Sequence, residues 1–143
     1  RKHLQLVPLP LAAESPDEVP MERAFIGGRR PAFRHGFAPI APHATAAALH
    51  ALYLELLHRC GISAVAAADG ELQSAPYNLL LRRRWMLVVA RSRECFETVS
   101  INALGFAGSL FVRTQAEQER VRAVGPMRVL RAVAVPAERG AAS

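Results

Sequence analysis

The sequence predicts an α+β fold, an antiparallel sheet with packed helices, from three observations. Apolar residues recur at helical spacing between Thr45 and Cys60. Two continuous apolar runs of strand length follow at Tyr77–Leu81 and Trp85–Val89. The residues Thr114 to Glu117 form a capping box that begins another helix. Because the two runs are continuous rather than alternating, we expect their strands to be covered on both faces, or on one face and by a cleft.

The N-terminal part is expected to contain two short strands separated by a long connection. The segment His3–Leu9 alternates and is rich in Leu and Val, which predicts a strand. This strand should end at Pro8 or Pro10, because proline cannot donate a hydrogen bond to a ladder. Residues 12–42 contain five prolines and a Gly-Gly pair, so they form a connection with one short strand at Phe33–Ala38.

The middle of the chain gives the clearest helix. Its apolar residues follow the i, i+3, i+4, i+7 and i+8 pattern, and Gly61 stands where a C-terminal cap belongs. These residues are Leu49, Leu52, Tyr53, Leu56 and Leu57. In residues 64–75, the pair Asp69-Gly70 signals a turn.

The second helix should run from Gln115 to about Val124 and stop at Gly125-Pro126. Met127–Val135 then forms either one more helical turn or a strand. A flexible tail is expected over Pro136–Ser143.

Composition indicates a single globular domain over residues 1–143, with 51% hydrophobic and 21% charged residues. The net charge of +6 favours an anionic partner, which could be a nucleotide, a nucleic acid or a membrane. The alternative is that the arginines simply occupy solvated faces.

The two cysteines, Cys60 and Cys95, stand apart, so neither a disulfide framework nor a structural metal is indicated. No segment approaches the length of a membrane span, and nothing near Arg1 reads as a signal peptide. A cytoplasmic location in a reducing compartment is expected. The chain lacks an initiator Met.

His3 and Gln5 are the sharpest candidates for chemistry, because residues i and i+2 of a strand point to the same face. A neutral imidazole can attack phosphorus, while a neighbouring amide donates to a non-bridging oxygen and holds the phosphate in line. The alternative is that His3 is a structural histidine with its hydrogen bonds satisfied.

A second candidate is the segment Asn102–Gly108, in which Gly105 and Gly108 would let the backbone approach a ligand and Asn102 could bond a hydroxyl or phosphate oxygen. The alternative is a tight turn packed beneath a strand. Two arginine clusters, Arg82–Arg84 and Arg91–Arg93, bracket the strand Trp85–Val89. They are either phosphate contacts or the solvated ends of a hairpin. The remaining histidines show no metal-ligand spacing.

Three stretches, KHLQLVPLP, APYNLLLRRRWMLVVARSRE and SINALGFAGSLFVR, together resemble successive signature blocks of the ATP adenylyltransferase (diadenosine tetraphosphate phosphorylase) family. The resemblance runs from His3 to about Val124. Its first block is also similar to the His-x-His-x-Gln of the wider histidine-triad group, in which the second His becomes nucleotidylated. The resemblance therefore implies a histidine-triad-like sheet that lacks its N-terminal part.

The resemblance implies transfer of AMP from diadenosine tetraphosphate to His3 and then to phosphate, which gives ADP and ATP. Gln5 would bond the phosphate. The nucleotide pocket and two later substrate contacts would use Asn102, Ala103, Leu104, Ser109 and Arg113. Many family members have an aliphatic residue or Met in place of Ser109 and Lys in place of Arg113. No cofactor is required by the sequence, although a divalent cation such as Mg²⁺ could assist.

Two departures from the family pattern matter. Arg1 stands where the first His of the motif belongs, and the other half of the family's proteins, with its lysine and phosphate loop, is absent. We therefore expect a C-terminal fragment that is weakly active or inactive alone, since each lost donor can cost about 10²–10³ in rate. An unpaired sheet edge would invite homodimerisation.

Two rival functions remain. One is a catalytically inactive nucleotide-binding module, in which the basic residues hold a phosphate-bearing ligand. The other is an RNA-binding domain, which would need an exposed aromatic platform; a single Trp and two Tyr, with Trp85 in an apolar strand, argue against it. The leading hypothesis predicts dinucleoside polyphosphate and phosphate as partners, with no nucleic acid and no membrane.

Overall fold

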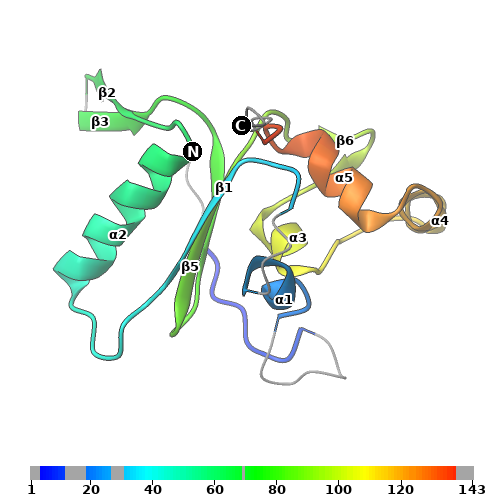
Figure 1. Cartoon of the computed structure of the whole chain (residues 1–143). Helices are drawn as coiled ribbons and strands as arrows, with labels where there is room; N and C mark the ends of the chain where they lie inside the picture. Colours follow the sequence, from blue (N-terminus) through cyan, green and yellow to red (C-terminus); the bar gives the residue numbers. More distant parts are fainter. Residues whose placement is uncertain (1–3, 12–18, 27–30, 69, 138–143) are drawn as a thin grey trace, which may run out of the picture.

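The fold is built on one buried strand with a partner on each side (Figure 1). The computed structural model describes residues 4–11, 19–26, 31–68 and 70–137. Strand β5 (Trp85–Ala90) pairs antiparallel with β1 (His35–Pro39) and with β4 (Tyr77–Leu81), in the order β1-β5-β4. All six residues of β5 are buried, which confirms that this apolar run is covered on both faces.

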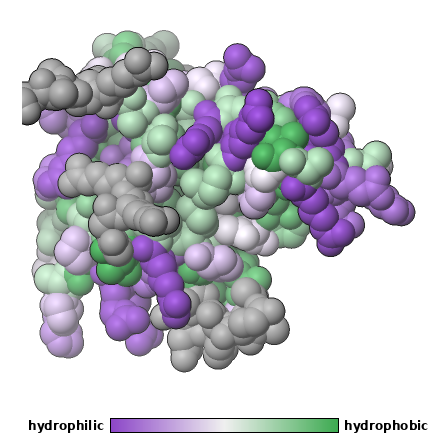
Figure 2. All heavy atoms as spheres, turned by 45° about the vertical axis from the view of Figure 1, so that its right-hand side comes forward, coloured by the Kyte–Doolittle hydropathy of each residue, from purple (hydrophilic) through white to green (hydrophobic). Residues whose placement is uncertain are grey.

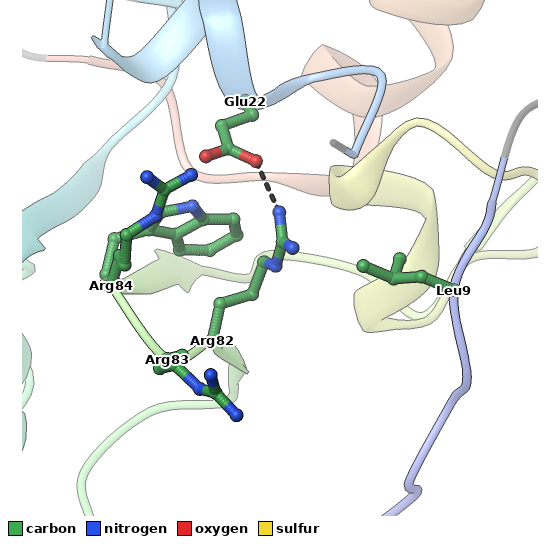
Figure 3. A pocket seen from close by; sticks show the side chains of 6 residues that line it. Leu9, Glu22, Arg82, Arg83 and Arg84 are labelled. Atoms are coloured by element: carbon green, nitrogen blue, oxygen red, sulfur yellow. Dashed lines mark hydrogen bonds and ion pairs between the residues drawn. The ribbon is translucent and has the colours of Figure 1, made fainter. Parts of the chain in front are cut away.

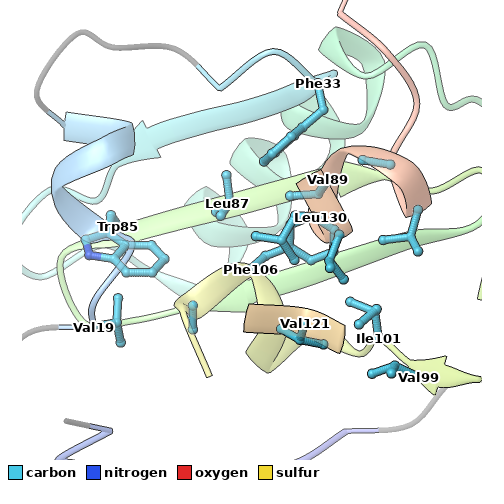
Figure 4. Packing of buried hydrophobic residues seen from close by; sticks show 14 residues of the cluster. Val19, Phe33, Trp85, Leu87, Val89, Val99, Ile101, Phe106, Val121 and Leu130 are labelled. Carbon is cyan, nitrogen blue, oxygen red and sulfur yellow. The ribbon is translucent and has the colours of Figure 1, made fainter. Parts of the chain in front are cut away.

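The two faces of β5 supply two separate cores, because successive side chains of a strand point to opposite sides. Trp85, Leu87 and Val89 join the larger cluster, which also contains residues of the C-terminal helices (Figure 4). Met86, Val88 and Ala90 join the smaller cluster beneath the long helix. We call the side of the sheet with the larger cluster the α3 face and the side with the smaller cluster the α2 face.

The α2 face is covered by the predicted helix, α2 (Ala46–Arg59). Thr45 caps its N-terminus by accepting a hydrogen bond from the Ala48 N–H through Oγ1 at 3.2 Å. A Cβ at Gly36 of β1 would lie 3.0 Å from the Leu56 carbonyl oxygen. The absence of a side chain at Gly36 therefore lets the helix backbone approach the sheet closely.

The α3 face is covered by four short helices: α1 (Glu22–Ile26), α3 (Ala103–Ala107), α4 (Gln115–Val124) and α5 (Pro126–Val133). For Met127–Val135 the sequence left a helical turn and a strand open, and the structure has the helix α5 there. The helix begins with a proline in its first turn. After α5 the chain returns to the sheet, where Ala134 bridges Arg91 and Pro136 bridges Phe33. The rest of the predicted tail, from residue 138, lies outside the described residues.

Two small hairpins complete the fold. The first, β2 (Ala64–Ala67) and β3 (Gly70–Gln73), forms around the predicted turn, of which Asp69 lies outside the described residues. The second, β6 (Cys95–Phe96) and β7 (Val99–Ser100), was not predicted from the sequence. Helix α1 was also not predicted, because five residues are too few for a periodic pattern.

The strand predicted at His3–Leu9 is wrong for the part of it that the structure describes. Leu4 to Leu9 form no strand, and the side chains of Leu4 and Leu6 are 90% and 94% exposed. Alternation predicts a strand only if a partner strand and a covering layer exist. Here no described strand pairs with the segment.

No helix within the described ranges is long and apolar enough to cross a membrane.

Hydrophilic side chains gather over the right-hand side of the molecule in Figure 2, where α4 lies. Only Val121 of that helix is buried. Helix α4 is therefore held by its caps and by a narrow apolar contact.

The capping box of α4 forms, but the Glu117 side chain accepts from the N–H of the residue before the N-cap and not from that of the N-cap itself. Thr114 Oγ1 accepts from the Glu117 N–H at 3.2 Å. The Glu117 carboxylate accepts from the Arg113 N–H at 2.7 Å and from the Thr98 hydroxyl at 2.9 Å. The hydrogen bond from the Arg113 N–H contributes most to a lowered pKa of Glu117, and that from the Thr98 hydroxyl adds to it.

Glu117→Gln is therefore expected to destabilise the protein at neutral pH and to have little effect in acid. A lowered folded-state pKa stabilises the fold above the unfolded value, about 4.3, and that contribution is lost as the pH falls through the folded value. Urea denaturation at pH 7 and near pH 3 measures the difference. The same substitution at exposed Glu71 controls for the change of charge, and an equal effect of both substitutions would contradict the account.

Candidate functional site

The candidate site is the segment from Asn102 to Arg113, which begins at α3. The Oδ1 atom of Asn102 accepts from the Leu104 N–H at 3.0 Å and caps the helix. Asn102 is exposed and Ala103 and Leu104 are half-buried, whereas the last three residues of α3 are buried. The helix thus anchors its C-terminal half in the core and holds the predicted nucleotide-contacting residues at the surface.

The two glycines of this segment are explained by packing. A Cβ at Gly105 would lie 2.9 Å from Ile101 Cγ2 and 3.1 Å from Leu110 Cδ2. Gly108 has φ of +104°, and a Cβ there would lie 2.6 Å from the Cβ of Pro20. The segment is a short helix and not the predicted tight turn, but packing alone accounts for Gly105 and Gly108, and the backbone approach to a ligand is not needed to explain them.

Ser109 and Arg113 follow α3 along the chain. The Ser109 N–H donates to the Leu104 carbonyl at 3.0 Å, so the half-buried Ser109 stays beside α3. Arg113 is exposed just before α4, and its backbone N–H donates to Glu117. Five of the predicted site residues thus lie in one stretch of the chain at exposed or half-buried positions: Asn102, Ala103, Leu104, Ser109 and Arg113.

Arg91 holds this segment in place. Its guanidinium donates to the Ile101 carbonyl at 2.7 Å, immediately before Asn102, and to Asn78 Oδ1 at 3.3 Å. It also donates to the carbonyls of Arg93 and Glu94. Burial lowers the pKa of Arg91. Arg91 therefore matches neither of the two alternatives for this cluster: it positions the segment, a role that nothing in the local sequence pattern indicated.

The N-terminal candidates are placed only in part. His3 lies outside the described residues. Gln5 is exposed, and no hydrogen bond within the described part of the chain joins it to Asn102. Further along the segment, Leu11 packs against the core cluster of the α3 face. The N-terminal segment therefore approaches the same face of the sheet as α3.

The arginines Arg82–Arg84 form the turn between β4 and β5 and line a cavity of about 670 Å³ (Figure 3). Arg82 forms an ion pair with Glu22 at 2.6 Å. Its guanidinium carbon also lies 5.9 Å from the centre of the Trp85 ring. This turn is the cationic end of a groove beside α1.

The remaining titratable groups show no built metal site. Within the described ranges, no three His, Cys, Asp or Glu side chains come together to hold an ion. Both thiols are free, with Cys95 exposed and Cys60 buried. The Cys60 thiol donates to the Val88 carbonyl at 3.6 Å, and burial raises its pKa.

Known proteins resemble this chain in sequence and in fold. A model of the ATP adenylyltransferase C-terminal domain matches residues 29–136. The crystal structure of yeast Ap4A phosphorylase Apa2 superimposes with a TM-score of 0.59 and 23% identity over 73% of this chain. The structure of the same yeast enzyme in complex with Ap4A gives a TM-score of 0.57 and 22% identity over 73% of this chain. A comparison with curated proteins gave no match.

The chain spans 37% and 35% of the lengths of those two yeast chains. The structural likeness supports the predicted fold class, an α+β arrangement around an antiparallel sheet. The family match covers most of the chain, including the sheet, α2 and the Asn102–Arg113 segment. This chain belongs to the ATP adenylyltransferase family, of which it carries the C-terminal domain.

Proposed function

We propose that the chain takes part in the phosphorolysis of diadenosine tetraphosphate to ADP and ATP, with His3 as the nucleophile. The family match supports a nucleotidyltransferase, and the yeast enzyme of similar fold is an Ap4A phosphorylase that has been crystallised with Ap4A. The single observation that carries the proposal is the placement of Asn102. Its side chain is exposed at the start of α3 and is oriented by a helix-capping hydrogen bond.

The proposed reaction has two steps. A ring nitrogen of His3 attacks the α-phosphorus, the bond from that phosphorus to the bridging oxygen breaks, and ATP leaves. An oxygen of inorganic phosphate then attacks the adenylyl phosphorus, the phosphorus–nitrogen bond breaks, and ADP leaves with His3 restored. Gln5 donates to a non-bridging oxygen and keeps the phosphate in line.

In this proposal the segment from Asn102 to Arg113 supplies the binding surface. Asn102 offers its amide N–H₂ to the nucleotide, since its oxygen already caps α3. The half-buried Ala103 and Leu104 form an apolar wall for the adenosine. Ser109 and the exposed cation Arg113 contact the substrate further along, where Arg113 would attract phosphate oxygens.

A second candidate is a nucleotide-binding module without catalysis. It requires only the surface that begins at the exposed Asn102, and not the chemistry of His3. Both hypotheses predict that diadenosine tetraphosphate binds. Only the enzyme hypothesis predicts that ADP and ATP appear when phosphate is added.

Asn102→Asp tests the proposed binding surface. Asp caps a helix as well as Asn does, so the stability should stay within about 0.5 kcal/mol of the wild type. The substitution removes the amide donor and adds a negative charge beside the phosphates, so we expect binding of diadenosine tetraphosphate to weaken about tenfold or more. Calorimetry measures binding, and chromatography of ADP and ATP measures turnover.

The matched control is Gln115→Glu, which makes the same chemical change at the exposed first position of α4. It should leave binding unchanged. Unchanged binding in Asn102→Asp, with a folded protein, would remove Asn102 from the site. Binding without product in the wild type would favour the inactive module.

A further inference from the structure

A groove beside α1 joins two cavities that have different linings. The first, of about 670 Å³, is lined by Leu9, Glu22, Arg82, Arg83, Arg84 and Trp85. The second, of about 830 Å³, is lined by Glu22, Arg23, Phe25, Ile26, Phe37, Pro39, Arg84 and Trp85. Because they share Glu22, Arg84 and Trp85, the two cavities form one continuous groove, which we call the α1 groove.

The first cavity is positively charged. Three arginines and one carboxylate line it, and that carboxylate is already paired with Arg82. Arg83 and Arg84 are exposed, and neither makes an ion pair within the described part of the chain. Figure 3 shows Arg82 and Arg84 on the side of the turn toward Glu22, and Arg83 on the other side. Guanidinium groups in this arrangement suit an anion with several oxygens, such as a phosphate chain.

The second cavity is aromatic. The rings of Phe25 and Phe37 lie nearly parallel, with centroids 6.3 Å apart and an interplanar angle of 9°. The Phe37 ring in turn lies 5.9 Å from that of Trp85. Both phenylalanines are half-buried, so part of each ring stays open to the groove. Exposed aromatic rings of this kind stack on planar heterocycles such as nucleobases.

Trp85 lies between the two halves and carries an unused hydrogen-bond donor. Its side chain is 3% exposed, and its Nε1 atom has no acceptor among the residues that the structure describes. Figure 4 shows this nitrogen at the margin of the core cluster, on the side away from Leu87 and Phe106. A buried N–H without an acceptor is unfavourable, so an acceptor oxygen of a ligand in the groove would stabilise it.

We propose that the α1 groove binds a nucleoside polyphosphate, with the planar base against Phe25 and Phe37 and the phosphates on Arg83 and Arg84. The cationic and aromatic halves of the groove meet at Arg84 and Trp85. In a nucleoside polyphosphate the sugar likewise joins the phosphates on one side to the base on the other. This site uses none of the residues assigned to the phosphorolysis reaction, so it stands or fails independently of the proposed function.

Trp85 is the single tryptophan of the chain, so its fluorescence reports directly on this groove. ATP is the probe, and inorganic tripolyphosphate tests the contribution of the base. We expect ATP to change the fluorescence saturably. The double variant Arg83→Ala/Arg84→Ala should weaken ATP binding about tenfold or more, because two charge-assisted contacts are lost.

The matched control is Arg122→Ala/Arg128→Ala, which removes the same charge from exposed positions on α4 and α5. It should bind ATP as the wild type does, and tripolyphosphate should bind the wild type more weakly than ATP. Thermal melting checks that both double variants are folded.

Four outcomes would overturn the proposal. One is no saturable change with ATP, and another is equal weakening in both double variants, which would indicate general charge attraction. A third is ATP binding that survives Arg83→Ala/Arg84→Ala, which would place ATP elsewhere and leave the proposed function untouched. The fourth is tripolyphosphate binding as tightly as ATP, which would exclude a contribution from the aromatic half.

Discussion

His3→Ala is expected to lower the phosphorolysis of diadenosine tetraphosphate to the rate without protein. In the proposed mechanism the His3 imidazole accepts the adenylyl group, so neither of the two steps can occur without it. Binding of the dinucleotide should change little, since the proposed binding surface lies on Asn102 to Arg113. Chromatographic detection of ADP and ATP at high protein concentration measures the loss.

A matched control is His50→Ala, which removes an exposed histidine of α2. That variant should keep the rate of the wild type. If His3→Ala and the wild type produced ADP and ATP at the same rate, His3 would not be the nucleophile.

Phe106→Ala should give the largest loss of stability, about 3–5 kcal/mol. Phe106 is fully buried in the core of the α3 face, and its ring contacts that of Phe33 edge to face, with centroids 5.5 Å apart. The substitution leaves a cavity beneath α3. A single domain is typically stable by about 5–15 kcal/mol, so the variant should unfold at a much lower urea concentration.

The chain offers a matched control in Phe111→Ala, because the Phe111 side chain is 61% exposed. Its effect should stay within about 0.5 kcal/mol. Equal midpoints of urea unfolding for the two variants would contradict the packing of α3 described above. Because α3 carries Asn102, Phe106→Ala should also weaken nucleotide binding at temperatures where it remains folded.

Local patterns predicted the elements that depend on local physics. The stripe of leucines predicted α2, because a helix of 14 residues needs a continuous apolar face. The continuous run at Trp85 predicted a strand buried on both faces, which β5 is. The capping box predicted the first residue of α4, since Thr114 accepts a hydrogen bond from the Glu117 N–H.

Elements that depend on distant partners were not predictable in this way. The alternation of Leu4 and Leu6 predicted a strand, but the described structure has no strand paired with them. The arginine cluster at Arg91 left two readings open. Its actual role depends on carbonyls at Ile101 and Glu94 that only the folded chain brings to it.

The candidate site shows the same division. The residue type of Asn102 suggested a ligand contact, yet its oxygen is used to cap α3, and only the amide remains for a nucleotide. The glycines suggested that the backbone approaches a ligand closely, but their close packing against Ile101, Leu110 and Pro20 explains them. Because capping and packing explain these residues, the proposed role of the segment rests on the resemblance to the family and not on its spacing.

Peptide mapping by mass spectrometry tests the central claim most directly. The chain is incubated with diadenosine tetraphosphate without phosphate, digested under conditions that preserve phosphorus–nitrogen bonds, and searched for an attached AMP group. We predict one modified peptide, in which His3 carries AMP, and loss of that group as ADP when phosphate is added. An AMP group on another residue, or none on a chain shown to bind the dinucleotide, would contradict the account.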